Sequence, residues 1–204
     1  MKTIITIGRQ YGSGGREIGK KVAEKLGIPF YDKELLARAA KESGFSEEMI
    51  RNHDERPNSS FLYNVAMDNF GLAISHTNAD LPIGQKVFLA QFDAVKAIAG
   101  EGACVIVGRC ADYALRELDH TLNIFIFGKE DAKAARISKL YNLTEEEAKK
   151  VCVKQDKKRQ SYYNYYSDKK WGRADSYDLC IDSGKLGIDG TVDFIVSYVK
   201  SLEE

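Results

Sequence analysis

The feature that most constrains this chain is a glycine-rich turn between an apolar segment and an amphipathic one. Residues 4–8 read Ile-Ile-Thr-Ile-Gly, a short β-branched run typical of a buried strand. Three glycines then stand within four residues, at Gly12-Ser13-Gly14-Gly15, and apolar residues recur at helical spacing from Ile18 onward. Because glycine turns without side-chain interference, successive backbone N–H groups can point inward at the positive end of the following helix. The turn therefore predicts an anion-binding loop, with a turn that only allows tight packing as the alternative.

The turn lacks the lysine of the Walker A motif GxxxxGK[ST], which reaches the terminal phosphates of a bound nucleotide. If Gly14 is the penultimate glycine of the motif, Gly15 stands at the lysine position and Arg9 at the first glycine. If Gly15 is the penultimate glycine, Arg16 replaces the lysine and Glu17 replaces the hydroxyl residue. The second register keeps a cation in place, as a planar guanidinium instead of a compact ammonium.

Strand-like and helical segments alternate along the rest of the chain. Apolar runs bounded by Gly, Asp or Asn predict further strands at residues 103–108, 122–127 and 177–182, with a weaker one at 29–31. This alternation predicts an α/β fold in three layers, with a doubly wound, parallel, five-stranded sheet. Ligands of such sheets bind at the carboxyl ends of the strands.

Two stretches extend beyond a minimal α/β domain. Residues from about 45 to 83 are polar and irregular, and they predict a helical, substrate-binding insert. Residues from about 144 to 171 predict a lid region built on one long charged helix, because Thr144 and the glutamates after it form a capping box. We expect a single domain over residues 1–204, whose core comprises residues 1–44, 84–143 and 172–204.

Composition argues against several classes of partner. The formal net charge is zero and no basic stripe stands out, so a nucleic-acid partner is not expected. No apolar run approaches the roughly 18 residues that span a bilayer, and Met1 leads into a strand rather than a signal peptide. We therefore expect a cytoplasmic protein with no membrane partner. The cysteines fit no zinc spacing, and Cys104 and Cys180 lie in strand-like runs, where a thiol packs as a small apolar group.

Four stretches occur in an order that is hard to produce by chance. They are the segment from Gly12 to Asp32, Val105-Ile106-Val107-Gly108-Arg109, Asp156-Lys157-Lys158-Arg159 and Tyr177-Asp178-Leu179-Cys180-Ile181-Asp182. Together they resemble the cytidylate kinase-like family, a divergent branch of the P-loop nucleoside monophosphate kinases. The resemblance implies a P-loop kinase-like fold, ATP and Mg²⁺ as cofactors, nucleotide substrates, and a monomer or homodimer. It places Gly15 at the P-loop lysine of orthodox cytidylate kinases and Glu17 at their threonine.

The candidate donor site is the loop itself. Its residues would hold the phosphates of ATP: Gly12, Ser13, Gly14, Gly15, Arg16 and Glu17. Phosphoryl transfer needs positive charge around the transferring group, and Arg16 would contact the donor β- and γ-phosphates. Glu17 would replace the missing hydroxyl as a Mg²⁺ ligand. Arg136, on the helix after the fourth strand, would lie near the lid and act as a further catalytic cation.

The candidate acceptor site lies at the carboxyl edge of the sheet. Arg109 follows a strand directly, so it would clamp an acceptor phosphate bidentately, with a strand-end salt bridge as the alternative. The resemblance implies the same role for Arg109 and adds Arg38, six residues after Asp32. Asp32 would contact the substrate or cap the helix that follows. Asp156 and Arg159 share one helix face and resemble a lid-side Asp-x-x-Arg pair, with a solvated charged face as the alternative. The resemblance implies that Arg159 approaches the phosphates as a catalytic cation and that Asp156 orients Arg159 or the substrate base.

Three functions stay open from the sequence. The first is phosphoryl transfer from ATP to CMP or a related nucleoside monophosphate. The second keeps this fold with another small-molecule acceptor. The third is a regulatory protein that binds a nucleotide without transfer, because the lysine is absent. The tyrosines of residues 162–166 with Trp171 would stack a base or pack into the core.

Overall fold

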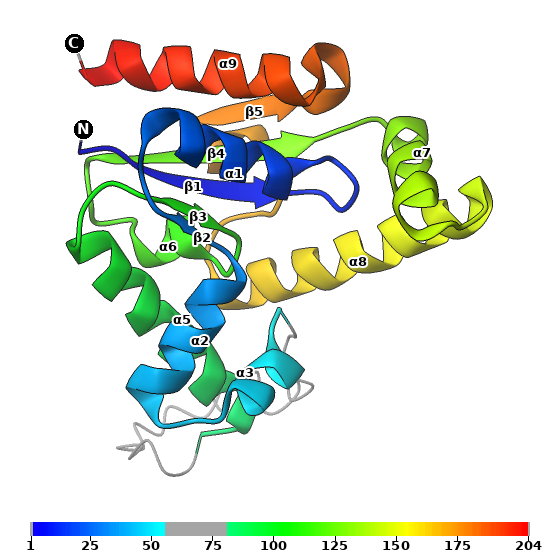
Figure 1. Ribbon diagram of the computed structural model, residues 1–204. Coiled ribbons are helices and arrows are strands. Elements are labelled where there is room, and N and C mark those ends of the chain that lie inside the picture. The colour runs from blue at the N-terminus through cyan, green and yellow to red at the C-terminus, as the bar shows by residue number, and fades with distance from the viewer. Residues whose placement is uncertain (1, 56–80, 204) are drawn as a thin grey trace.

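The protein is built on a five-stranded, all-parallel sheet with the strand order β2-β3-β1-β4-β5 (Figure 1). The computed structural model describes residues 2–55 and 81–203. Its strands are β1 (Ile4–Arg9), β2 (Phe30–Tyr31), β3 (Val105–Val107), β4 (Thr121–Phe127) and β5 (Leu179–Asp182). All five strands expected from the sequence are present, and the parallel, doubly wound sheet is confirmed.

The central strand β1 determines where a ligand can bind. It pairs with β3 on one side, with Ile5 opposite Val105, and with β4 on the other, with Ile5 opposite Leu122. The chain leaves β1 toward β2 on one side of the sheet, whereas β4 lies on the other side. The strand order therefore reverses at the carboxyl end of β1, which is the position where open α/β sheets bind ligands.

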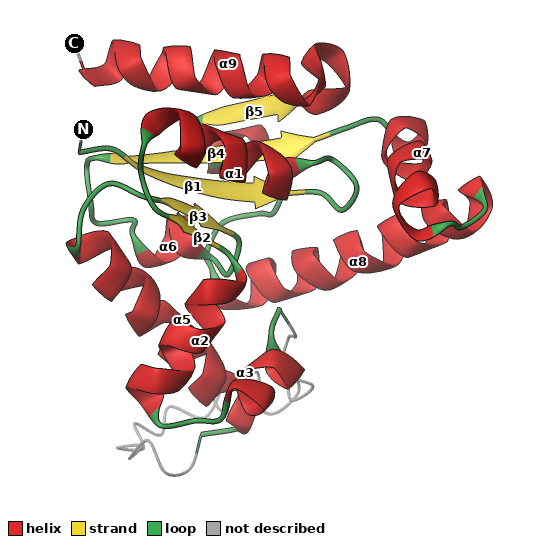
Figure 2. Ribbon diagram, in the orientation of Figure 1, coloured by secondary structure: helices red, strands yellow, loops and turns green. Residues whose placement is uncertain are grey.

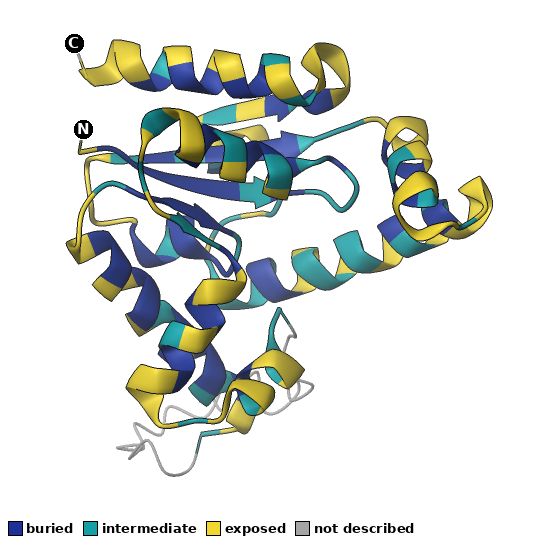
Figure 3. Cartoon of the chain, in the orientation of Figure 1, coloured by how far each residue is buried: buried dark blue, intermediate teal, exposed yellow. Residues whose placement is uncertain are grey.

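Helices cover both faces of the sheet, which gives the three expected layers (Figure 2). One face carries α1 (Gly15–Leu26) and α9 (Ser183–Glu203), whose buried side chains pack against Ile5 and Ile7. The other face carries α2 (Lys33–Ser43), α5 (Ile83–Gly100) and α6 (Ala111–Ala114), which pack around Ile4. Because both faces are covered, β1 is buried along almost its whole length instead of on alternate residues, and it lies in the buried centre of the molecule (Figure 3).

Two further helices form an arm beside the strand ends. Helix α7 (Glu130–Tyr141) stands beyond the arrowheads of the strands, and α8 (Glu145–Tyr166) runs back below the sheet toward α5 (Figure 1). Thr144 caps α8 with the expected capping box. The far end of α8 is fixed in the core, since Tyr166 stacks on Phe88 of α5 with ring centroids 3.9 Å apart.

In the part of the chain that the structure describes, the remaining short elements are the helix α3 (Glu47–His53) and a 3₁₀ turn, η2 (Ala174–Ser176). Residues 56–80 of the expected insert, with the helical pattern around Phe61 and Phe70, lie outside the described residues, so the insert and domain boundaries stay predictions. Cys104 is buried as expected, but the expectation for Cys180 was wrong: it is exposed, on the face of the edge strand β5 opposite to Ile181. Among residues 2–55 and 81–203, no helix is long and apolar enough to cross a membrane.

Candidate active site

The glycine-rich loop joins β1 to α1 at the carboxyl end of the central strand. Gly12 and Gly14 adopt left-handed conformations, with φ values of 84° and 78°. A side chain at Gly12 would also meet the carbonyl oxygen of Lys133 in α7 at 2.9 Å, and one at Gly14 would collide with Ile188 at the start of α9. Both positions therefore favour glycine because of the left-handed turn, and Gly12 is favoured also by its close approach to the backbone of α7. The first N–H groups of α1 have no partner within the helix, which leaves donors for an anion at this end.

A cleft of about 1000 Å³ lies beside this loop. Its lining includes most of the residues predicted from the sequence: Gly12, Gly14, Gly15, Arg16, Glu17, Asp32, Arg109, Arg136 and Arg159. They come from the loop, α1, the residue before α2, the segment after β3, α7 and α8, so the fold brings together residues that are far apart in the chain. Ser13, Arg38 and Asp156 do not line the cleft. The buried hydroxyl of Ser13 instead donates to the carbonyl of Gln10 at 2.8 Å and shapes the loop.

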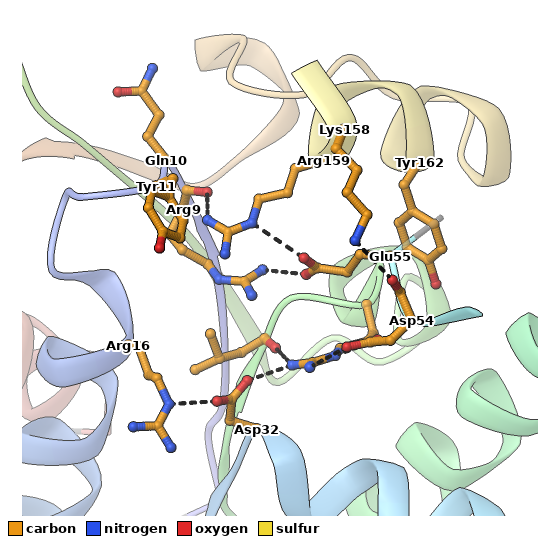
Figure 4. A network of polar contacts seen from close by, with 12 residues as sticks. Arg9, Gln10, Tyr11, Arg16, Asp32, Asp54, Glu55, Lys158, Arg159 and Tyr162 are labelled. Atoms are coloured by element: carbon orange, nitrogen blue, oxygen red, sulfur yellow. Dashed lines mark hydrogen bonds and ion pairs between the residues drawn. The ribbon is translucent and has the colours of Figure 1, made fainter. Parts of the chain in front are cut away.

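Asp32 links the two sides of the cleft (Figure 4). One of its oxygens accepts from Arg16 Nε at 2.6 Å, and the other accepts from Arg109 Nη1 at 2.5 Å. Burial raises the pKa of the Asp32 carboxyl, but Arg109 and Arg16 lower it by more, so its pKa lies below the usual value. Asp32 directly precedes α2, yet its side chain makes no capping hydrogen bond. A carboxylate between two guanidinium groups thus replaces the helix cap that the sequence allowed.

Arg109 is buried, and all three nitrogens of its guanidinium donate hydrogen bonds. Its Nε and Nη2 atoms donate to the two carboxylate oxygens of Asp54 at 3.2 and 2.9 Å, and Nη1 also donates to the carbonyl of Val107 at 2.9 Å. Burial lowers the pKa of this guanidinium, but Asp54 and Glu55 raise it by more, so the group stays charged. The residue itself has a left-handed φ of 52°, in a run of three positive φ values that begins at Gly108. Strained backbone of this kind is held only where surrounding contacts fix it.

Glu55 lies between two further arginines (Figure 4). It accepts from Arg9 Nη1 at 2.8 Å and from Arg159 Nε at 3.2 Å, and Arg159 also donates to the backbone carbonyl of Arg9 at 3.3 Å. Sequence reasoning missed Asp54 and Glu55 altogether. They lie in the polar stretch taken as an insert, where nothing in the pattern distinguishes them from solvated acidic residues.

Arg136 reaches the loop from α7. Its guanidinium forms an ion pair with Glu17 and comes within 3.7 Å of the position that a side chain on Gly14 would occupy. Glu17 also lies 3.7 Å from Lys21 and is partly exposed. Among the described residues, no three His, Cys, Asp or Glu side chains converge on a metal position. Mg²⁺ in kinases is held by substrate phosphates with one or two carboxylates, so Glu17 beside the loop fits this arrangement.

Asp156 lies behind the loop, away from the cleft lining. One carboxylate oxygen accepts the backbone N–H of Tyr11 at 2.6 Å, and the other accepts from Lys133 Nζ at 2.8 Å. Lys133 is buried, and sequence reasoning did not single it out. Asp156 and Arg159 therefore share a helix face but have different partners. Asp156 attaches the loop to the α7–α8 arm.

Arg38 lies apart from the other candidates. Its guanidinium pairs with Glu42 in its own helix and with Glu101 after α5, where Nη2 and Oε1 are 2.7 Å apart. The aromatic cluster of α8 also packs inward: Trp171 meets Phe125 edge-on at 5.2 Å, and Tyr162 and Tyr163 are buried. Neither feature reaches the cleft beside the loop.

Comparison with known proteins shows which family the chain resembles. The model of the cytidylate kinase-like family matches residues 4–185. The chain is 26% identical to the cytidylate kinase of Pyrococcus horikoshii, covering 99% of this chain and 91% of that protein. It is 25% identical to the cytidylate kinase of Methanothrix thermoacetophila, covering 98% of this chain and 99% of that protein.

Solved structures give the same fold. A crystal structure of an uncharacterized protein from Eubacterium ventriosum is 32% identical, with a TM-score of 0.71 and coverage of 98% of this chain and 99% of that one. The shikimate kinase of Bacteroides thetaiotaomicron is 12% identical with a TM-score of 0.54, covering 98% of this chain and 99% of that one. The gluconokinase of Sinorhizobium meliloti is 14% identical with a TM-score of 0.53, covering 98% and 93%. These two kinases share the fold alone, and the fold is that of the P-loop kinases.

Proposed function

Because this chain belongs to the cytidylate kinase-like family, we propose that it transfers a phosphoryl group from ATP to a nucleoside monophosphate of the CMP class. Family and fold together support a phosphotransferase that acts on a nucleotide or another small molecule. The identity of the donor and of the acceptor is our proposal.

The convergence of Arg16 and Arg109 on Asp32 carries this proposal. Arg16 stands in the first turn of α1, beside the loop where donor phosphates would bind. Arg109 stands at the end of β3, with a buried fork of the type that binds phosphate or carboxylate bidentately. Since both bind the same carboxylate, donor and acceptor groups held by these two arginines would lie next to each other. Adjacent, fixed reactants and concentrated positive charge are the main requirements of phosphoryl transfer.

Other residues would complete the site. The N–H groups of the loop and of the first turn of α1 would hold the donor phosphates, and Arg136 would neutralise charge from the α7 side. Glu17 would hold Mg²⁺, which, when bound, neutralises charge on the donor phosphates. Arg38 and Asp156 stay predictions from the sequence, because each has other partners outside the cleft.

A coupled ADP-release assay across nucleoside monophosphates tests the proposal. The wild type is expected to turn over at least one of them, and Arg109→Ala to raise the acceptor KM by about 10- to 100-fold, the usual value of a lost charge-assisted pair. Arg173→Ala is the matched control, because Arg173 is exposed and pairs with Asp175 away from the cleft. Absence of ADP release with every acceptor at high enzyme concentration would refute phosphoryl transfer to nucleotides.

One observation favours a second candidate, a nucleotide-binding protein without transfer. The Walker A lysine is absent, and the five arginines that converge near the loop each have a carboxylate partner: Arg9, Arg16, Arg109, Arg136 and Arg159. ATP binding measured by calorimetry beside turnover separates the two functions. Binding of ATP without ADP release in the presence of any acceptor supports the second candidate.

A further inference from the structure

Two adjacent acidic residues fill the most cationic part of the cleft. Asp54 follows α3 directly, and Glu55 is next in the chain. The carboxylate of Asp54 accepts hydrogen bonds from Nε and Nη2 of Arg109. The carboxylate of Glu55 accepts from Arg9 with one oxygen and from Arg159 with the other. Glu55 also has a left-handed φ of 49°, a rare conformation for a residue other than glycine.

The two contacts have the geometry of phosphate recognition. A guanidinium fork binds a carboxylate or a phosphate through the same two parallel hydrogen bonds, and a phosphate between two arginines takes a separate oxygen to each. From this geometry we infer that Asp54 and Glu55 occupy two anion-binding positions, one on Arg109 and one between Arg9 and Arg159. Phosphate groups of the substrates take the place of the two carboxylates at these positions. This inference rests on the proposed function for the identity of those phosphates.

The balance of charge supports replacement over joint occupancy. Four guanidinium groups, of Arg9, Arg16, Arg109 and Arg159, face three carboxylates, so the network has a net charge of +1. Departure of Asp54 and Glu55 would leave +3, which suits doubly negative phosphates. A phosphate added beside both carboxylates would instead face like charges in a partly buried site. Burial raises the pKa of Glu55, but Arg9 and Arg159 lower it by more, so this carboxylate stays ionised.

The third carboxylate is held differently. Asp32 bridges two arginines, and its side chain is 6% exposed, against 19% for Asp54 and 12% for Glu55. Asp54 and Glu55 follow a helix of seven residues that buries the side chain of Ile50. Two further donors hold Asp54: Gln91 donates to its carboxylate and Lys158 to its backbone carbonyl, both at 3.2 Å. Asp32 is therefore a permanent part of the network, and Asp54 and Glu55 are its exchangeable part.

Binding of inorganic pyrophosphate tests the inference without requiring turnover. Calorimetry on the full chain compares the wild type with Asp54→Asn, Glu55→Gln and the double variant at fixed ionic strength. The double variant is expected to bind pyrophosphate about tenfold more tightly, which corresponds to about 1.4 kcal/mol. Glu47→Gln is the matched control, because Glu47 lines the same cleft but lies 3.8 Å from exposed Arg51 and does not contact the network. Its change measures the general effect of removing one negative charge.

The outcomes separate this inference from the proposed function. The two anion-binding positions are supported if each single variant gains more affinity than Glu47→Gln, or if the double variant gains more than twice the free energy gained by Glu47→Gln, even if the wild type phosphorylates no acceptor. A gain no larger than this, or unchanged or weaker binding, overturns the inference even if the wild type is an active kinase, because the two carboxylates would then only orient the arginines. The single variants keep the test open if the double variant fails to fold, and each is expected to show part of the gain. Melting with and without pyrophosphate gives a second readout, in which the variants should gain more stability than the wild type.

Discussion

Replacement of Asp32 by asparagine tests how much stability this carboxylate provides by joining Arg16 to Arg109. Asp32→Asn keeps the shape of the side chain and removes the charge that Arg16 and Arg109 share. Breaking a buried ion pair costs about 3–5 kcal/mol. We take the low end, about 3 kcal/mol, because Arg109 keeps Asp54 and the Val107 carbonyl, and because Arg16 is 57% exposed and its pair is screened by water. For a domain of this size the loss corresponds to a fall in Tm of roughly 6–12 °C.

Thermal melting at pH 7 measures this effect, with Asp193→Asn as the control, since Asp193 is exposed and pairs with Lys25 on the surface. The control is expected to change Tm by less than about 2 °C. The pKa of Asp32 is lowered in the folded protein, so its contribution is complete above the unfolded pKa and is lost as the pH falls through the folded one. The difference between wild type and variant should therefore be constant from pH 6 to 8 and shrink below about pH 4. If Asp32→Asn has the same Tm as the Asp193→Asn control at pH 7, the pairs of Asp32 with Arg16 and Arg109 do not stabilise the folded protein.

Three further predictions concern single positions. Gly14→Ala is expected to destabilise by about 1–2 kcal/mol, since its φ is positive and the new side chain must displace the terminal methyl group of Ile188, whereas Gly100→Ala, where nothing lies within 4 Å, should be close to neutral in the same melt. Arg38→Ala should leave the acceptor KM of the active enzyme within about twofold, because its guanidinium pairs with two glutamates outside the cleft; an increase above about tenfold would restore the role implied by the family resemblance. Burial raises the pKa of the Asp112 carboxyl, so its protonated form favours folding at low pH, and that stability is lost as the pH rises through the folded pKa. Asp112→Asn should therefore have a higher Tm than the wild type at pH 7, and a difference that does not shrink toward pH 4 would contradict this reasoning.

Local patterns in the sequence were sufficient to predict the strands of the sheet and the positions of several residues that line the cleft. Short apolar runs predicted all five strands, the second of them only weakly, and the capping box at Thr144 predicted the start of α8. The position of Arg109 in the cleft followed from a general rule, because a residue directly after a parallel strand must lie at the carboxyl edge. Arg16 followed in the same way from the start of α1.

Partners across the cleft could not be predicted, because they depend on contacts between distant segments. Arg9 and Glu55 are 46 residues apart, and Tyr11 and Asp156 are 145 residues apart. Arg38 shows that a position in the sequence does not determine the partners of its side chain. The family resemblance implied a phosphate contact at this position, but the guanidinium pairs with Glu42 of α2 and with Glu101 after α5. A residue pattern gives the element on which a side chain stands, whereas the direction of a long side chain depends on what packs around it.

The attachment of the glycine loop to the α7–α8 arm bears on whether this loop is a transferable module. Its backbone is fixed by Asp156 of α8 through the N–H of Tyr11, and by the main chain of α7 against Gly12. A transplant of residues 4–26 into another scaffold would carry the strand, the glycines and the helix, but not the two surfaces that fix the shape of the turn. Any engineered protein that is meant to inherit the loop needs the arm as well, and the smallest inheritable unit therefore comprises segments from both halves of the chain.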